Sequence, residues 1–257
     1  MNNRWQAPTR VFFVIATVLA LPAASFAQVQ LKVIVSGGFQ AAYQEALPEF
    51  ERTAGVTVTT TSGASQGNGP NTIGAQLGRG VPADVVIMAK EGLVELIANG
   101  KIVAGTNVDL AQTPVGVSVR AGAPKPDIST VDAFKQTLLR AKSVVIPPST
   151  VGIYLTTKLF PRLGIADEMA GKTTTSGSVA KGDAELAVRA VSELLHVPGT
   201  DFVGTIPPEV QFISVFSAAV VAGSKEPEAS KRLIAFLASE KATTAVKNSG
   251  MERLRPR

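Results

Sequence analysis

Three short loops carry the glycine and hydroxyl residues that commonly bind small anions in α/β proteins. They span residues 36–38, 62–71 and 149–152, and each follows a predicted strand and precedes a predicted helix. Unpaired N–H groups at a helix N-terminus carry about half a positive charge, glycine permits close backbone approach, and hydroxyls add neutral donors. Because ligands bind beyond the carboxyl ends of parallel strands, we predict that these loops share one anion site that needs no Arg or Lys.

Other kinds of chemistry have little support in the sequence. His196 is the single histidine and there is no cysteine, which excludes a multi-histidine or thiolate metal site. The chain has no phosphate-binding loop of the nucleotide-hydrolase kind, no nucleophile elbow and no zinc-binding helix motif. Lys90 and Glu91 follow a buried strand, where either could approach a ligand. Neither a metal nor a cofactor is predicted.

The segments that would position these loops alternate between strand and helix, which predicts an α/β fold with mainly parallel sheets. Strands or strand-like segments are predicted at 31–35, 56–61, 85–88, 115–119, 143–146, 202–204 and 212–216. Helices are predicted at 40–53, 72–79, 91–99, 130–140, 149–163, 228–237 and 240–247. Residues 36–39 are expected to form a tight turn, and the pattern at 183–192 does not distinguish helix from strand.

The N-terminal segment has the layout of a cleavable export signal. Arg4 and Arg10 precede the apolar run 11–21, and in Ser25-Phe26-Ala27 the small residues Ser25 and Ala27 occupy the two positions that a signal peptidase reads. The apolar run is about half of the roughly 20 residues that span a bilayer. We therefore expect residues 1–27 to be a signal peptide and the mature protein to be periplasmic.

Composition and charge narrow the classes of ligand. The formal net charge is +5, and Lys and Arg cluster only at the C-terminal Arg253, Arg255 and Arg257, so no nucleic-acid partner is expected. Aromatic residues make up 5% of the chain, which disfavours sugars and bases that need stacking platforms. An exported protein without cysteine has no disulfides, so its core alone holds it together. A monomer that binds a small anion is the expectation.

Four segments resemble the periplasmic molybdate-binding proteins and their relatives, namely 35–39 (Val-Ser-Gly-Gly-Phe), 80–87, 152–154 (Gly-Ile-Tyr) and 218–224. The resemblance runs over nearly all of the chain after residue 27. It implies a type II periplasmic-binding fold, in which two lobes are joined by a two-crossover hinge, and an ABC permease as partner. Lobe 1 would comprise residues 29–113 plus 215–257, and lobe 2 would comprise residues 114–214.

The resemblance also implies which residues bind the anion. The family's ligands fall on Gly38 and Asn71, where the family has serines, on the backbone of Val151, and near Ala190, where the family has a tyrosine. The segment 172–181, where the family has a backbone ligand, is shorter than usual. The predicted ligand-binding residues are Ser36, Gly37, Gly38, Ser62, Ser65, Asn71, Ser149, Thr150, Val151 and Tyr154.

The chain is still more similar to a branch that includes bacterial aconitate isomerase, an enzyme built on this receptor fold. The similar segments are 36–39, 119–128 and 191–195. This implies a carboxylate in the cleft and a base that moves a carbon-bound proton from one end of an allylic system to the other. Glu193, Lys90 and His196 are the candidates for the base, and the sequence does not choose among them.

Two functions therefore stay open. The first is a periplasmic substrate-binding protein of an ABC transporter, which closes around a molybdate-like oxyanion or a carboxylate and catalyses nothing. The second is an isomerase that interconverts cis- and trans-aconitate on the same fold. The three anion-type loops and the absence of a catalytic motif favour the first, and the branch resemblance favours the second.

Overall fold

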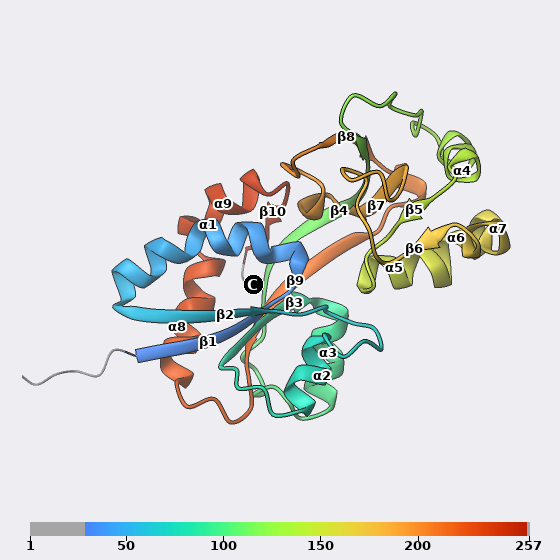
Figure 1. The fold of residues 1–257 in the computed structure, drawn as a ribbon. Helices are drawn as coiled ribbons and strands as arrows, with labels where there is room; N and C mark the ends of the chain where they lie inside the picture. Colours follow the sequence, from blue (N-terminus) through green and yellow to red (C-terminus); the bar gives the residue numbers. More distant parts are fainter. Residues whose placement is uncertain (1–28, 256–257) are drawn as a thin grey trace, which may run out of the picture.

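One continuous ten-stranded sheet runs through the part of the chain that the computed structural model describes, residues 29–255 (Figure 1). Its strands follow the order β2-β1-β3-β9-β4-β7-β5-β6, and β8 and β10 both pair with β4. The strands are β1 (Val29–Val35), β2 (Val56–Ser62), β3 (Val85–Ala89), β4 (Val108–Arg120), β5 (Val144–Val145), β6 (Thr173–Thr174), β7 (Leu186–Ala190), β8 (Thr200–Thr205), β9 (Ile213–Val220) and β10 (Glu252–Arg253). The predicted signal peptide lies outside the described residues.

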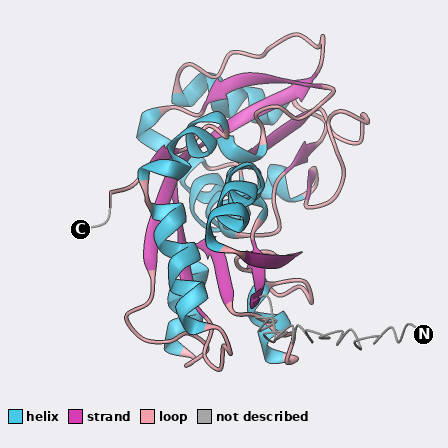
Figure 2. Cartoon of the chain, turned by 90° about the vertical axis from the view of Figure 1, so that its left-hand side faces the viewer, coloured by secondary structure: helices cyan, strands magenta, loops and turns pink. Residues whose placement is uncertain are grey.

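Helices pack around the strands of the sheet (Figure 2). They are α1 (Gly37–Ala54), α2 (Ile73–Gly78), α3 (Lys90–Ala98), α4 (Val131–Arg140), α5 (Thr150–Tyr154), α6 (Phe160–Leu163), α7 (Ala166–Ala170), α8 (Pro227–Ala238) and α9 (Thr243–Asn248), with short turns η1 (Leu155–Leu159), η2 (Val191–Glu193), η3 (Pro208–Val210) and η4 (Glu240–Ala242). Within residues 29–255, none of these helices has the length and apolar character needed to cross a membrane.

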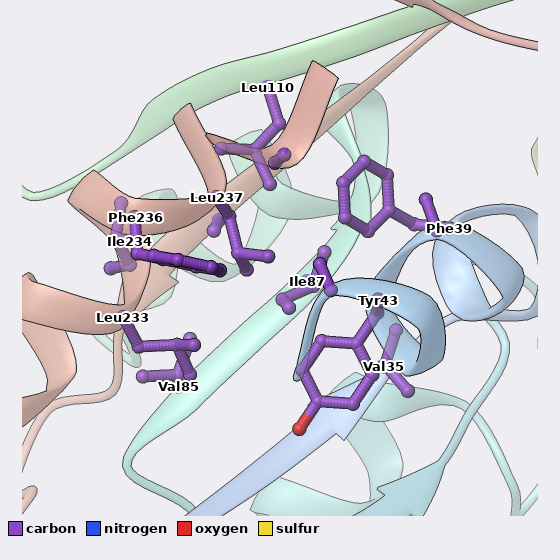
Figure 3. Close-up of a cluster of buried hydrophobic side chains, with 14 of the residues drawn as sticks. Val35, Phe39, Tyr43, Val85, Ile87, Leu110, Leu233, Ile234, Phe236 and Leu237 are labelled. Atoms are coloured by element: carbon purple, nitrogen blue, oxygen red, sulfur yellow. The ribbon is translucent and has the colours of Figure 1, made fainter. Parts of the chain in front are cut away.

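Buried side chains divide the molecule into two lobes. One set of hydrophobic clusters draws on β1, β3, α1, α8 and α9, and Figure 3 shows part of it around Tyr43 and Leu237. The other set draws on residues between Val115 and Val210. The division falls within β4, which pairs with β9 as far as Pro114 and with β7 from Val115 onward. This division within β4 lies close to residue 114, where the sequence predicts that lobe 2 begins. We propose residue 114 as the boundary between the lobes.

The direction of strand pairing places the predicted loops at one cleft. In lobe 1, β1 runs parallel to β2 and β3, and in lobe 2, β5 runs parallel to β6 and β7. The crossing strands β4 and β9 add the antiparallel pairs. Residues that directly follow β1, β2, β3 and β5 therefore come together where the lobes face each other, as expected for the carboxyl ends of parallel strands.

Two local expectations need correction, and one open segment is assigned. The tight turn at 36–39 is instead the first turn of α1, in which the N–H of Phe39 donates to the carbonyl of Ser36 at 3.1 Å. The helix expected at 149–163 is interrupted by the π-helical turn η1. The segment 183–192, for which the sequence left helix and strand open, contains the strand β7 and the beginning of η2, and its alternating apolar side chains face the core of lobe 2.

Candidate functional site

A cavity of about 340 Å³ lies between the two lobes, at the ends of the strands described above. Nine of the ten predicted ligand-binding residues line it: Ser36, Gly37, Gly38, Ser62, Ser65, Asn71, Ser149, Thr150 and Val151. Its wall also includes Gln40, Ala89, Arg189, Ala190, Glu193, Ser214 and Phe216. Small-molecule sites range from about 300 to 1,000 Å³, so this cavity suits a small ligand.

Ser36 presents an unused hydroxyl at the N-terminus of the 18-residue helix α1. Its backbone N–H donates to the carbonyl of Ile87 at 2.8 Å, which fixes the residue in an extended conformation. The side chain does not cap its own helix, unlike those of Thr72 and Thr130. The Ser36 Oγ is buried without a hydrogen-bond partner, although buried hydroxyls are normally paired. It is therefore available to a ligand.

Phe216 explains why residue 38 is a glycine. A Cβ at Gly38 would overlap the tip of the Phe216 ring, which itself packs against Phe39 with ring centroids 6.1 Å apart. A serine at this position would not fit without moving the ring. The Phe216 ring therefore forms an apolar wall on this side of the cavity.

The loop after β2 is held in shape by polar contacts. The side chain of Gln76 donates to the carbonyls of Ser62 and Asn71, at 3.0 and 3.1 Å, and so joins the two ends of the loop. The Ser65 hydroxyl accepts the N–H of Ala89 at 2.9 Å, which ties the loop to the end of β3. These contacts preorganise the lobe 1 side of the cavity.

A hydrogen bond crosses the cleft between the lobes. The hydroxyl of Thr150, in lobe 2, donates to the side-chain carbonyl of Gln66, in lobe 1, at 2.9 Å. The amide nitrogen of Gln66 donates in turn to Glu95 at 2.5 Å, which orients the Gln66 side chain. Next to it, Gly67 lies beneath the carbonyl of Pro148, where a Cβ would come within 2.8 Å. The two lobes are therefore in contact beside the cavity.

Arg189 and Glu193 bring opposite charges to the cavity wall from lobe 2. Arg189 lies on β7, and the prediction of a site without Arg or Lys missed it because segment 183–192 was not assigned. The alternation Leu186, Val188, Ala190 was the signal that could have placed its side chain on the face opposite the core. The cavity thus has a cation that is able to pair with a carboxylate.

Glu193 is the acidic side chain that reaches the cavity from the segment 191–195. Its Oε1 lies 3.3 Å from the position that a Cβ on Gly37 would take, so the carboxyl group faces the N-terminus of α1. Burial raises the pKa of Glu193, while the Arg189 charge and the backbone N–H of Ala190 lower it in part. A carboxyl group with a raised pKa can exchange a proton nearer to neutral pH than an ordinary glutamate.

The remaining predicted residues lie away from the cavity. Lys90 forms an ion pair with Asp109 at 2.6 Å. His196 is exposed, and its Nε2 lies 3.1 Å from the carbonyl oxygen of Asn248. The Tyr154 hydroxyl donates to the carbonyl of Val210 at 2.9 Å. None of Lys90, His196 and Tyr154 is among the residues that line the cavity.

Replacing Glu193 with glutamine is expected to stabilise the protein at neutral pH. A pKa raised by folding means that the native state holds the proton more tightly than the unfolded state. The contribution of Glu193 to the free energy of unfolding is therefore greatest below its unfolded pKa of about 4.3, and it declines as the pH rises through the raised native value. Melting temperatures of Glu193→Gln and wild type should agree near pH 4 and separate towards neutral pH. A difference that does not vary with pH contradicts this.

Comparisons with known proteins identify the family of the chain. Residues 31–252 match the family model for bacterial extracellular solute-binding proteins. An aconitate isomerase from a Pseudomonas species is 40% identical over 228 residues, which cover 86% of this chain and 87% of that protein.

Two solved structures share the fold. The periplasmic molybdate-binding protein of Azotobacter vinelandii superposes with a TM-score of 0.69 at 20% identity, over 88% of this chain and 100% of that one. The sulfate-binding protein SubI of Mycobacterium tuberculosis gives a TM-score of 0.67 at 19% identity, over 88% of each chain. The type II periplasmic-binding fold is thus established, and the chain belongs to the bacterial extracellular solute-binding proteins.

Proposed function

We propose that this protein is an isomerase of a small unsaturated tricarboxylate, and specifically that it interconverts trans- and cis-aconitate in the cleft between the lobes. The observation that carries the proposal is the position of the Glu193 carboxyl group, which lies on the cavity wall with Arg189 and faces the N-terminus of α1. Its burial, which raises the pKa, supports a role in proton transfer. The 40% identity to an aconitate isomerase over most of both chains supports it.

The proposed reaction moves one proton and one double bond. The Glu193 carboxylate removes a proton from the substrate methylene group, and the C–H electron pair spreads over the allylic system and its carboxylates. Glu193 then returns the proton to the former vinylic carbon, which leaves the double bond at the other end. The substrate and the product contain the same atoms at the same oxidation level, so the reaction needs no cofactor. A base of tuned pKa accelerates such proton transfers by about 10²–10⁴-fold.

The charges of the cavity suit a substrate with several carboxylates. The N–H groups at the start of α1 and the free Ser36 hydroxyl offer neutral donors for one carboxylate. Arg189 offers a cation for another and stabilises the charge that develops during proton removal. A tetrahedral oxyanion alone would leave Glu193 facing a negative ligand without a role. This favours a carbon acid over molybdate as the ligand.

A direct assay tests the proposal. The purified protein is incubated with trans-aconitate, and the appearance of the cis isomer is followed by chromatography. Conversion that scales with protein concentration is expected. An absence of turnover at every pH between 5 and 9 would overturn the proposed isomerase activity.

Replacing Arg189 with methionine is expected to weaken substrate binding by roughly 10- to 100-fold, since a charged hydrogen bond is worth about 1.5–3 kcal/mol. The change also removes a group that lowers the pKa of Glu193, so the acidic limb of the profile of kcat/KM against pH should move to higher pH. Arg120→Met, at the end of β4 and outside the cleft cavity, is the matched control. An unchanged KM and pH profile in Arg189→Met contradict this role.

A second candidate function is a receptor that delivers a small oxyanion or carboxylate to an ABC permease from the periplasm. The hydrogen bond between Thr150 and Gln66 favours it, because contacts between lobes are what a receptor needs to close around a ligand. Calorimetry with molybdate, tungstate, sulfate and citrate tests this function. Binding of one of these anions by a protein that does not isomerise aconitate would favour the receptor function. An absence of measurable binding for all four anions would count against it.

A further inference from the structure

A second cavity lies on the other side of Glu193 and Arg189. Its volume is about 320 Å³, and both residues line it as well as the cleft cavity. On β7, Ala187 and Arg189 lie on the face opposite Val188 and Ala190, and both Ala187 and Arg189 line the second cavity. The turn η2 then brings Glu193 between the two spaces. We call the second space the back cavity.

The back cavity is suited to hold water. Its wall carries the polar residues Ser118, Ser178 and Thr200 in addition to Arg189 and Glu193. At about 30 Å³ for each water molecule, its volume admits roughly ten of them, and polar partners are what buried water requires. Its outer rim includes Val197, whose side chain is exposed. Water is therefore able to reach Glu193 from this side.

The cleft side offers less access once a ligand is bound. The hydrogen bond between Thr150 and Gln66 joins the two lobes beside the cleft cavity. A tricarboxylate bound in this cavity of about 340 Å³ would fill the space in front of Glu193. A base that was reached only from the cleft would then keep its abstracted proton and return that same proton to the substrate. A base that is also reached from behind exchanges its proton with solvent.

We infer that the back cavity is a water route by which Glu193 exchanges its proton with solvent while the substrate is held in the cleft. The inference rests on the proposed isomerase function. The C–H bond at the methylene carbon breaks, and the proton is transferred to the Glu193 carboxylate. That proton exchanges with a water molecule of the back cavity, and Glu193 then forms the new C–H bond at the former vinylic carbon with a solvent-derived proton.

Isomerisation in D₂O tests this route. Trans-aconitate with ordinary hydrogen is converted by the full-length wild-type protein, and early cis product is analysed for deuterium by mass spectrometry and NMR. Ser178→Leu replaces a polar side chain of the back cavity by a bulky apolar one, and Val197→Trp blocks its rim from an exposed position. Ser176→Leu, on the same loop but outside the cavity lining, is the matched control.

The expected result is one solvent deuterium in most wild-type and Ser176→Leu product molecules. Ser178→Leu and Val197→Trp should lose most of this label while they still form product, because the original proton then returns to the substrate. Wild-type product without deuterium, or equal labelling in all four proteins, overturns the water route and leaves the isomerase function standing. A wild-type protein that forms no cis-aconitate overturns both.

Discussion

Glu193→Gln is expected to lower kcat for aconitate isomerisation by about 10²–10⁴-fold, the usual contribution of a positioned general base. Glutamine keeps the size of the side chain and removes its ability to accept and return a proton. The cleft itself should still bind tricarboxylates, because Arg189 and the N-terminus of α1 are unchanged. Steady-state kinetics with trans-aconitate, and calorimetry with citrate on the same sample, separate the loss of chemistry from a loss of binding.

Control variants make this test specific to one carboxyl group. Glu209→Gln changes an exposed glutamate of lobe 2 that does not line the cleft cavity, so its kcat should match the wild type. Lys90 and His196, the other candidate bases, contact Asp109 and the Asn248 carbonyl instead of the cavity. Lys90→Met and His196→Gln should therefore remain active. A Glu193→Gln protein with kcat within about tenfold of wild type removes Glu193 from the role of base.

The positions of the three loops could be predicted because local signals mark them. The apolar run 31–35 and the β-branched run 56–61 identify strands, and the glycine and hydroxyl residues after them identify turns. The rule that ligands bind at the carboxyl ends of strands then brings the loops together. This reasoning uses only patterns that lie within a few residues of each loop.

Contacts that are distant in sequence account for what could not be predicted. Two adjacent glycines at 37 and 38 suggest a turn, but Gly38 lies within α1 and leaves space for the ring of Phe216, a residue of β9. Likewise, Arg189 lines the cleft only because β7 pairs with β4 and β5 in a particular register. The position of Glu193 depends on η2, which turns the chain directly after β7. The local alternation on β7 marks the face on which Arg189 lies, but no local pattern places that face, Gly38 or Glu193 at the cleft.

Gly152→Ala is expected to lower the melting temperature by several degrees, the largest stability effect that we predict for a single methyl group near the cleft. A Cβ at Gly152 would overlap the carbonyl oxygen of Pro147. Because that oxygen belongs to the backbone, the helix α5 would have to move, and overpacking of this kind costs about 1–3 kcal/mol or more. The gain in helix propensity from alanine returns at most about 1 kcal/mol. For a chain of this size, each kcal/mol shifts the melting temperature by about 2–4 °C.

Gly78→Ala is the matched control, since Gly78 ends α2 and a Cβ there has no atom within 4 Å. Its melting temperature should equal or slightly exceed that of the wild type. The movement of α5 in Gly152→Ala should also disturb Thr150, which lies in the same turn and bonds to Gln66 across the cleft. Citrate binding should therefore weaken in Gly152→Ala and not in Gly78→Ala. If both variants have the melting temperature of the wild type, the backbone at Pro147 shifts at little cost in free energy. Close packing of α5 is then not what holds Thr150 at the cleft.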